Sequence, residues 1–239
     1  MRVSAVAMEK MKRYAIYYTP EDSPDSAAFA QAAAEWLGWD LARGRAVAQP
    51  VFDLPLPMAD ITAAPGKYGF HGTIKPPFRL ADGVKVADFH AATERLAAGL
   101  QAVDCGALRL VDLDGFLAFV PQGNPAPLQH LAAQVVQELD RFRAPLTTGE
   151  LARRRPEGLT PRQRELLGLY GYPYVLEEFQ FHLTLSGPLA EPQRARVAQA
   201  ADTHFAGLLA HPLHLRELCL CGEDQQGQFH LLHRYRLSA

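Results

Sequence analysis

The chain has 239 residues, of which 48% are hydrophobic and 21% charged, and its formal net charge at pH 7 is −2. This composition is typical of a soluble globular protein, and a chain of this length forms one large domain or two small lobes. The near-neutral charge argues against a protein whose main task is to grip long nucleic acid, although it allows a local positive pocket for a small phosphorylated ligand.

The sequence carries no sign of a membrane or secretory segment. No apolar run approaches the roughly 18 residues that a membrane-spanning helix needs. Residues 1–10, MRVSAVAMEK, are too short and too weakly apolar for a signal peptide and are expected to precede the first strand. Cys105, Cys219 and Cys221 form an odd set without a disulfide framework. We therefore expect a cytoplasmic protein that does not associate with membranes.

The first half of the chain alternates predicted strands and helices. Strands are indicated by aromatic and β-branched residues between turn residues, and helices by apolar residues at helical spacing. In chain order we expect a strand at 12–20, a helix at 25–41, a strand within 68–78, a helix at 87–100, and strands at 106–115 and 116–122. The last two strands are joined at Asp114-Gly115, which is a strong hairpin signal.

The second half repeats this order after an insertion. We expect a helix at about 125–142, a basic segment at 144–175, a strand at 177–189, a helix at about 191–210, and strands at 213–223 and 229–237. Within the basic segment, Thr160 as N-cap followed by Pro161 marks the start of a helix, and Gly171 marks its end.

An internal repeat connects the two halves. The stretch FHGTIKPPF at residues 70–78 matches FHLTLSGPL at residues 181–189. Each stretch is followed by a predicted helix and hairpin, and the spacing from the histidine to the hairpin glycine agrees within one residue. The period is too long for a solenoid repeat. The repeat therefore predicts two lobes related by a pseudo-twofold axis.

Strand periodicity gives the repeat a chemical meaning. Residues two apart in a strand face the same side, so His71 and Thr73 project together, as do His182 and Thr184. A pseudo-twofold axis between the lobes would place the two pairs opposite each other. We therefore expect two imidazoles and two hydroxyls to face one shared cleft.

Two opposed histidines suit a displacement at phosphorus. One neutral imidazole removes a proton from the attacking oxygen, and one protonated imidazole supplies a proton to the leaving oxygen. The threonine hydroxyls would donate hydrogen bonds to the phosphoryl oxygens, where charge develops. The sequence does not orient the substrate, so naming His182 the base and His71 the acid is an arbitrary starting assignment.

The paired motifs resemble those of the 2H phosphoesterase superfamily. Within it the sequence is similar to the DUF1045 family, bacterial proteins often encoded beside phosphonate-degradation genes, over nearly all of residues 12–237. The resemblance implies an α+β fold, bilobal and pseudo-twofold, with antiparallel sheets lining a central cleft and helices outside. It also implies metal-independent phosphodiester hydrolysis, with His71 and His182 as the acid–base pair and Thr73 and Thr184 as phosphate binders.

The resemblance also suggests boundaries and a substrate. We expect lobe 1 at about 12–125, a helix and basic inter-lobe segment at about 126–175, and lobe 2 at about 176–239. The phosphonate association points to a small ribose cyclic phosphate, resembling the 1,2-cyclic 5-phosphoribosyl intermediate of C–P bond cleavage. One alternative is an RNA-end 2′,3′-cyclic or 2′,5′ phosphodiesterase or ligase-like enzyme, which would meet nucleic acid only as short ends. Another is a non-catalytic nucleotide-binding module.

Further residues are candidates for substrate binding. Lys75 lies two residues after the motif threonine and shares its face if the strand continues, so its ammonium can bind phosphate. Ser186 stands at the equivalent position of the second motif and would make the cleft asymmetric. Arg153 can hold a second phosphate at the cleft, and Tyr17 and Tyr170 can stack on a sugar or base. The structural alternatives are a solvated strand end for Lys75, a solvated charged face for Arg153, and a place in the core for the two tyrosines.

No metal or other cofactor is expected. Two pairs of histidines have members three residues apart in strand-like sequence, so each pair would point to opposite faces. Cys219 and Cys221 share a face but lack the second pair of a four-ligand zinc site. The sequence contains no G-x-x-x-x-G-K-[ST] loop, so ATP use by the P-loop mechanism is unsupported. The sequence leaves the oligomeric state open.

Overall fold

A computed structural model of the chain describes residues 11–20, 24–209 and 211–238, and the N-terminal stretch 1–10 lies outside the described residues. The strands are β1 (Arg13–Tyr18), β2 (Trp39–Asp40), β3 (Arg45–Ala46), β4 (Gly72–Phe78), β5 (Val103–Gly106), β6 (Leu108–Leu113), β7 (Phe116–Pro121), β8 (Leu183–Thr184), β9 (Leu213–Leu215), β10 (Glu217–Glu223) and β11 (Phe229–Arg236). The α-helices are α2 (Pro24–Leu37), α3 (Met58–Ile61), α4 (Ala63–Gly66), α5 (Val86–Gly99), α6 (Pro125–Leu139), α7 (Thr148–Arg153), α8 (Pro161–Tyr170) and α9 (Gln193–His204). Short 3-10 turns are η1 (Asp140–Phe142), η2 (Pro156–Gly158) and η3 (Leu176–Glu178).

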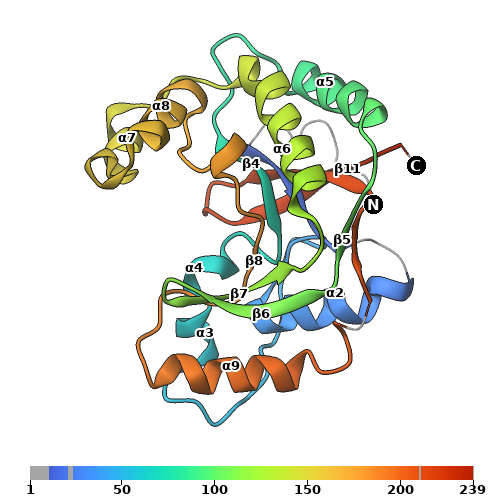
Figure 1. Ribbon diagram of the computed structural model, residues 1–239, viewed down its shortest axis with the longest axis vertical. Coiled ribbons are helices and arrows are strands. Elements are labelled where there is room, and N and C mark those ends of the chain that lie inside the picture. Colours follow the sequence, from blue (N-terminus) through green and yellow to red (C-terminus); the bar gives the residue numbers. More distant parts are fainter. Residues whose placement is uncertain (1–10, 21–23, 210, 239) are drawn as a thin grey trace.

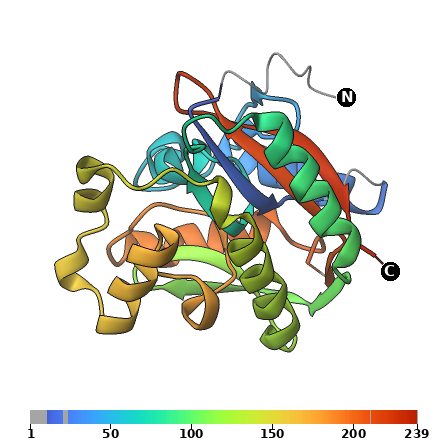
Figure 2. The same cartoon turned by 90° about the horizontal axis from the view of Figure 1, so that it is seen from above.

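The central element is an antiparallel sheet. In the part of the chain that the structure describes, seven strands pair in the order β11-β10-β1-β4-β8-β7-β6. Figure 1 shows α5 and α6 beside the half that contains β4 and β11, and α2 and α9 beside the half that contains β6 and β7. Seen from above, α5 runs along β11, while the segment with α7 and α8 stands at the side of the molecule (Figure 2). The predicted α+β class with antiparallel pairing is confirmed.

The two halves of the sheet exchange their hairpins. The hairpin β6–β7 follows β4 in the chain but pairs with β8, whereas β10–β11 follows β8 but pairs through β1 with β4. The helices follow the same exchange, because α5 contacts β10 and β11 and α9 contacts β7. Each half of the sheet therefore takes strands from both predicted lobe ranges, 12–125 and 176–239, and the ranges do not coincide with the halves.

The strand β1 is buried on both faces. Tyr14, Ile16 and Tyr18 belong to the large hydrophobic core, while Ala15 and Tyr17 belong to a smaller cluster on the opposite face, together with side chains of β10 and β11. A strand buried on both sides reads as a nearly continuous apolar run, as YAIYY does. The second face of β1 is the face on which the motif residues lie.

The strand β4 contains a bulge at Ile74 that turns Lys75 away from Thr73. Tyr17 stands opposite Thr73 but Ile16 stands opposite Lys75, so β4 carries one extra residue between these pairs. Because paired residues of an antiparallel ladder share a face, Lys75 lies on the face of Ile16 and not on that of Thr73. The prediction that Lys75 and Thr73 share a face is therefore wrong.

Other local predictions are confirmed by backbone geometry. The hairpin between β6 and β7 turns at Asp114 and Gly115, whose φ angles are 49° and 103°. The helix α8 begins with a capping box between Thr160 and Gln163, with Pro161 in its first turn, and ends at Gly171 with φ 72°. None of the helices in the described ranges combines the length and apolar character that a membrane crossing requires.

Candidate active site

The two motifs meet at the centre of the sheet, where β4 pairs with β8. Gly72 of β4 stands opposite Leu183 of β8. In an antiparallel ladder this register places each motif histidine opposite the threonine of the other motif. Leu183 belongs to the large core, so the flanking residues of both strands lie on the other face. The structure thus brings together His71, Thr73, His182 and Thr184.

Gly72 is required because an aromatic ring occupies the space of a side chain. A Cβ built at Gly72 would lie 2.3 Å from Cζ of Phe181, which is far closer than atoms can approach. Phe181 precedes the second motif histidine and is buried in the core. The backbone at Gly72 thus accommodates a close approach, and the approaching group is a side chain of the other motif.

Both histidines are oriented by the same hydrogen bond. Nδ1 of His71 lies 2.8 Å from the carbonyl oxygen of Gly69, and Nδ1 of His182 lies 2.9 Å from that of Gln180. A carbonyl oxygen only accepts, so Nδ1 carries the hydrogen and donates it. In a neutral ring the second nitrogen, Nε2, then carries no hydrogen and can accept a proton. Each motif therefore leaves the same atom open.

His71 lies in the more protected environment. Its ring stacks on Tyr17 of β1, with 4.0 Å between the ring centroids and 29° between the planes. Burial lowers the pKa of His71 to about 4, and nearby His182 adds to the lowering, while the hydrogen bond to Gly69 opposes it. At neutral pH His71 is therefore an unprotonated base.

His182 lies at a more open part of the same face. Its nearest aromatic neighbour is Phe116 of β7, whose ring centroid is 5.8 Å away at an interplanar angle of 57°. The neighbouring strands also differ, because Thr184 stands opposite the small Ala118 whereas Thr73 stands opposite Tyr17. The two copies therefore share a hydrogen-bonding template but not an environment.

Tyr17 carries a buried hydroxyl without a hydrogen-bond partner among the described residues. The side chain is completely buried beside His71. Burial raises the pKa of its phenol well above the usual value, helped by Cys221, Tyr68 and more distant Tyr172. A buried polar atom that lacks a partner is uncommon in a folded protein and marks a place where a ligand can bind.

Lys75 and Ser186, which follow the two motifs at equivalent positions, are both engaged within the protein. Nζ of Lys75 donates to the carbonyl oxygen of Val136 and to Asp140, each at 3.2 Å. Oγ of Ser186 accepts from the backbone N–H of Leu117 at 3.0 Å and donates to a carbonyl oxygen. Burial lowers the pKa of Lys75 to about 8, against the attraction of Asp140. Lys75 therefore supports the contact between β4 and α6.

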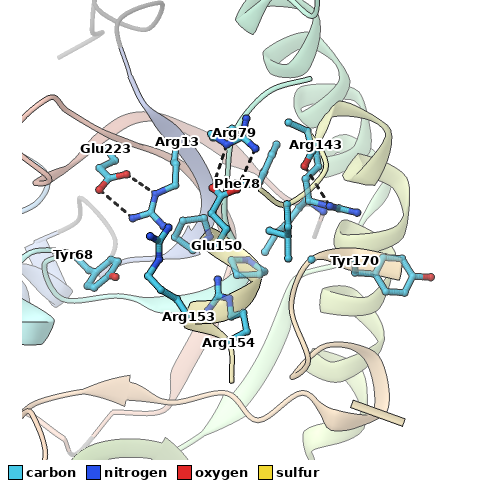
Figure 3. Close-up of a pocket in the computed structure, with 16 residues that line it drawn as sticks. Arg13, Tyr68, Phe78, Arg79, Arg143, Glu150, Arg153, Arg154, Tyr170 and Glu223 are labelled. Atoms are coloured by element: carbon cyan, nitrogen blue, oxygen red, sulfur yellow. Dashed lines mark hydrogen bonds and ion pairs between the residues drawn. The ribbon is translucent and has the colours of Figure 1, made fainter. Parts of the chain in front are cut away.

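Close to His71 lies a cavity of about 440 Å³, which Figure 3 shows with its lining residues. Tyr68 lines this cavity, and its ring centroid is 5.7 Å from that of His71. The remaining walls come from β1, the end of β4, β10 and the basic segment. We call this space the arginine cavity, because its lining includes Arg13, Arg79, Arg143, Arg153 and Arg154.

The structure separates the residues that the sequence proposed for substrate binding. Tyr17 lies against His71, and Arg153 lines the arginine cavity. Lys75 touches the cavity but directs its ammonium into the ion pair with Asp140. Tyr170 borders the cavity, yet Figure 3 shows its ring pointing away from the labelled arginines.

Sequence reasoning missed three residues of this region. Arg13 shares the strand face of Tyr17, which the alternation of β1 indicates once that strand is placed beside the first motif. Tyr68 lies two residues before the first repeat stretch, FHGTIKPPF, and nothing in the sequence alone distinguishes it from a core aromatic residue. Arg154 belongs to the triplet that begins at Arg153, and the sequence does not distinguish the members of a charge run.

Comparison with known families gives one match of broad coverage. The model of the DUF1045 family, described as a protein of unknown function, matches residues 73–230. This range contains the second motif in full and begins at the threonine of the first.

Two curated relatives carry the name ribose 1,5-bisphosphate phosphokinase PhnN. The protein from Janthinobacterium sp. (strain Marseille) is 36% identical over 236 residues, which are 94% of this chain and 50% of the relative. The protein from Laribacter hongkongensis (strain HLHK9) is 34% identical over 201 residues, which are 84% of this chain and 46% of the relative. The chain thus spans about half the length of these relatives.

Solved structures with a similar outline include E. coli LigT complexed with phosphate, with 10% identity, a TM-score of 0.44, and coverage of 96% of this chain and 99% of the other. A structure described as a phosphoesterase has 11% identity, a TM-score of 0.46, and the same coverage of both chains.

Proposed function

We propose that the chain, which belongs to the DUF1045 family, is a phosphodiesterase that opens a small cyclic phosphate by two-histidine general acid–base catalysis. One observation carries the proposal: adjacent antiparallel strands present two His-x-Thr pairs on one face. Both histidines donate from Nδ1 to a backbone carbonyl, which leaves Nε2 for the substrate. Such a pair suits a displacement at phosphorus because the reaction needs one proton removed and one supplied.

In the proposed mechanism, the environments of the histidines assign their roles. Water attacks phosphorus, and neutral His71 takes its proton at Nε2. The ring P–O bond breaks, and His182 in its protonated form gives a proton to the departing ribose oxygen. This reverses the arbitrary assignment made from the sequence, because the lowered pKa of His71 keeps that residue unprotonated at neutral pH.

The threonines stabilise the phosphoryl group in this mechanism. No hydrogen bond within the described residues engages the hydroxyl of Thr73 or Thr184, so both can donate to non-bridging oxygens. Donors placed where negative charge develops typically contribute about 10²–10³ in kcat each. Proton transfer and charge stabilisation are thus both assigned to side chains, and the mechanism needs no metal ion.

A ribose cyclic phosphate is the substrate that the relatives support best. Their names state that they act on ribose 1,5-bisphosphate. Opening the 1,2-cyclic phosphate of ribose 5-phosphate at the bond to ribose O2 gives that compound. Hydrolysis by a chain of this family would therefore supply the substrate of the kinase for which its relatives are named, in keeping with the expected link to phosphonate catabolism.

Turnover of a panel of cyclic phosphates in the presence of EDTA tests the proposal. The panel contains ribose cyclic phosphates, 2′,3′-cyclic nucleotides, a 2′,5′-linked dinucleotide and a short RNA with a cyclic phosphate end, and phosphorus NMR identifies the bond that opens. We expect a small ribose cyclic phosphate to be hydrolysed, and His71→Ala and His182→Ala each to lower kcat about 10²–10⁴-fold.

Other outcomes would favour the alternatives. Preference for RNA ends or the 2′,5′ linkage would support an RNA-end enzyme. Binding without hydrolysis across the panel would support a nucleotide-binding module. Full activity in either histidine variant would refute the proposed mechanism.

A further inference from the structure

The arginine cavity is strongly positive. Six cationic side chains line it, namely the five arginines and Lys75, against two carboxylates, Glu150 and Glu223. A surplus of this size in one cavity raises the local concentration of anions and favours a ligand that carries more than one negative charge. Such a surplus contrasts with the net charge of −2 of the whole chain.

Most of these cations already have partners within the protein. Arg13 binds Glu223 through Nε and Nη2 at 2.5 and 3.0 Å. Arg79 binds Glu150 through two contacts of 3.1 Å. Arg143 binds Asp140 at 2.8 and 2.9 Å, and Lys75 shares that carboxylate. The lining therefore divides into paired cations that build the walls and a remainder that is free to bind a ligand.

Arg153 and Arg154 are that remainder. Neither guanidinium pairs with a carboxylate in the described ranges. Arg154 lies over the ring of Tyr172, with 4.7 Å from its Cζ to the ring centroid, so it is held by an aromatic face that leaves its N–H donors open. Figure 3 shows both side chains reaching toward the space between Arg13 and Glu150.

The short helix that carries these arginines is fixed to the sheet. Its N-cap, Thr147, forms a capping box with Glu150. The same Glu150 carboxylate accepts two hydrogen bonds from Arg79, which follows β4, and Arg79 also donates to the carbonyl oxygen of Pro145 at 2.8 Å. The Arg79 contact lowers the pKa of Glu150 to about 2, so the anchor stays charged at neutral pH. The helix that carries Arg153 and Arg154 is thereby held against the sheet before any ligand arrives.

Two tyrosines, Tyr68 and Tyr17, lie between this cavity and the motif histidines or beside them. The ring of Tyr68 contacts His71 on one side and lines the arginine cavity on the other. Tyr17, whose hydroxyl is unpartnered among the described residues, stacks on the same histidine ring. A ligand that passes the Tyr68 ring would reach both the histidines and the arginines.

From this arrangement we propose that the arginine cavity binds a second, terminal phosphate monoester of the substrate, with Arg153 and Arg154 as its ligands. The inference rests on the proposed function and narrows its substrate class to sugar cyclic phosphates that also carry a phosphomonoester. A monoester phosphate bears close to two negative charges at neutral pH and three acceptor oxygens, which matches two unpaired guanidinium groups. The basic segment is thus a recognition element for small substrates.

Binding of ribose 5-phosphate to the intact chain tests this site without turnover. Isothermal titration compares ribose 5-phosphate with ribose and with the methyl ester of ribose 5-phosphate, which keeps only one charge. We expect ribose 5-phosphate to bind at least about 10-fold more tightly than the methyl ester, and ribose not to bind detectably. Equal binding of the two phosphates would overturn the proposal without any variant being made.

Matched double variants identify the residues. Arg153→Gln combined with Arg154→Gln is expected to weaken ribose 5-phosphate binding about 10- to 100-fold. Arg155→Gln combined with Arg164→Gln removes the same charge from the same segment, but neither residue lines the cavity, so binding should be unchanged. Equal losses of affinity in both double variants would show that only the total charge of the segment matters. That result would refute the site.

The test of ribose 5-phosphate binding and the test of cyclic phosphate hydrolysis can fail independently of each other. If no cyclic phosphate is hydrolysed but ribose 5-phosphate binds with this pattern, the cavity stands and the proposed function fails. If cyclic phosphates with and without the monoester are hydrolysed with equal kcat/KM, the function stands and the cavity assignment fails.

Discussion

The two copies of the motif differ in their surroundings far more than in their own geometry. Both histidines donate from Nδ1 to the carbonyl oxygen two residues earlier. The first copy, however, lies on a strand of 7 residues beneath Tyr17, whereas the second lies on a strand of 2 residues beside Phe116. A duplicated template thus presents the same atom twice, and neighbouring strands give each copy different surroundings, of which those of His71 lower its pKa. When their environments move the pKa values of two titrating groups apart, one group can act as the acid and the other as the base.

The largest effect that tests this comparison is the pH dependence of kcat/KM, which reports the free enzyme. Because the pKa of His71 is lowered to about 4, kcat/KM should rise as pH increases through about 4. His71→Asn should lower kcat/KM about 10²–10⁴-fold and abolish the rise of kcat/KM near pH 4. His182→Asn should lower kcat/KM to a comparable extent but keep this rise.

The opposite roles would give the opposite curve. If His71 were the acid, activity would fall as pH increases through about 4, because the residue would lose the proton that it must donate. If kcat/KM of His71→Asn still rose near pH 4, another group would be responsible for that pH dependence.

A smaller effect concerns the residues that follow each motif. Lys75→Met should lower the free energy of unfolding by about 1.5–3 kcal/mol, because Val136 and Asp140 lose a buried charged donor. Chemical denaturation measures this loss, and kcat/KM should be unchanged if Lys75 does not bind phosphate. A large rise in KM with unchanged stability would restore Lys75 to the substrate site.

The Lys75 effect also has a pH signature. Its folded-state pKa of about 8 lies below the ordinary 10.5, so between these values the unfolded chain binds more protons than the folded one. Wild-type stability should therefore rise relative to Lys75→Met from about pH 8 to 10.5. Ser186→Ala, which removes the buried acceptor of the Leu117 N–H, should also destabilise but without this pH dependence.

The arrangement of the motif residues could be predicted from the sequence because it depends on short-range rules. Strand alternation places His71 with Thr73 and His182 with Thr184, and the repeat implies that they meet. The hairpin at Asp114-Gly115 follows from its two turn residues in the same way. Each of these inferences concerns residues that are close in the chain or related by the repeat.

The remaining features depend on long-range packing, which the sequence does not display. The bulge at Ile74 is set by the pairing of β4 with β1, and it moves Lys75 to the other face. The exchange of hairpins between the halves places β10 and β11, rather than β6 and β7, on the side of β1. Arg153 and Arg154 become distinct from Arg155 only when the segment is anchored through Glu150 to Arg79.

The smallest expected effect, whose sign is the most informative, is that of changing Tyr17, which lies against the histidine of the first motif only. The hydroxyl of Tyr17 is buried and unpartnered among the described residues, so Tyr17→Phe should raise the free energy of unfolding by about 1 kcal/mol. If that hydroxyl instead finds its partner in the substrate, KM should increase about 3- to 10-fold with kcat preserved. Chemical denaturation and steady-state kinetics on the same variant measure both quantities.

Tyr235→Phe is the matched control for this prediction. Tyr235 is also buried, but its hydroxyl lies 2.6 Å from Nδ1 of His90, so its removal should lower stability by about 0.5–1.5 kcal/mol and leave KM unchanged. Opposite signs of the stability change in the two variants would show that Tyr17 keeps an unsatisfied group beside His71. A loss of stability in both would mean that the hydroxyl of Tyr17 is already satisfied, and the asymmetry between the two copies would then rest on the stacked ring alone.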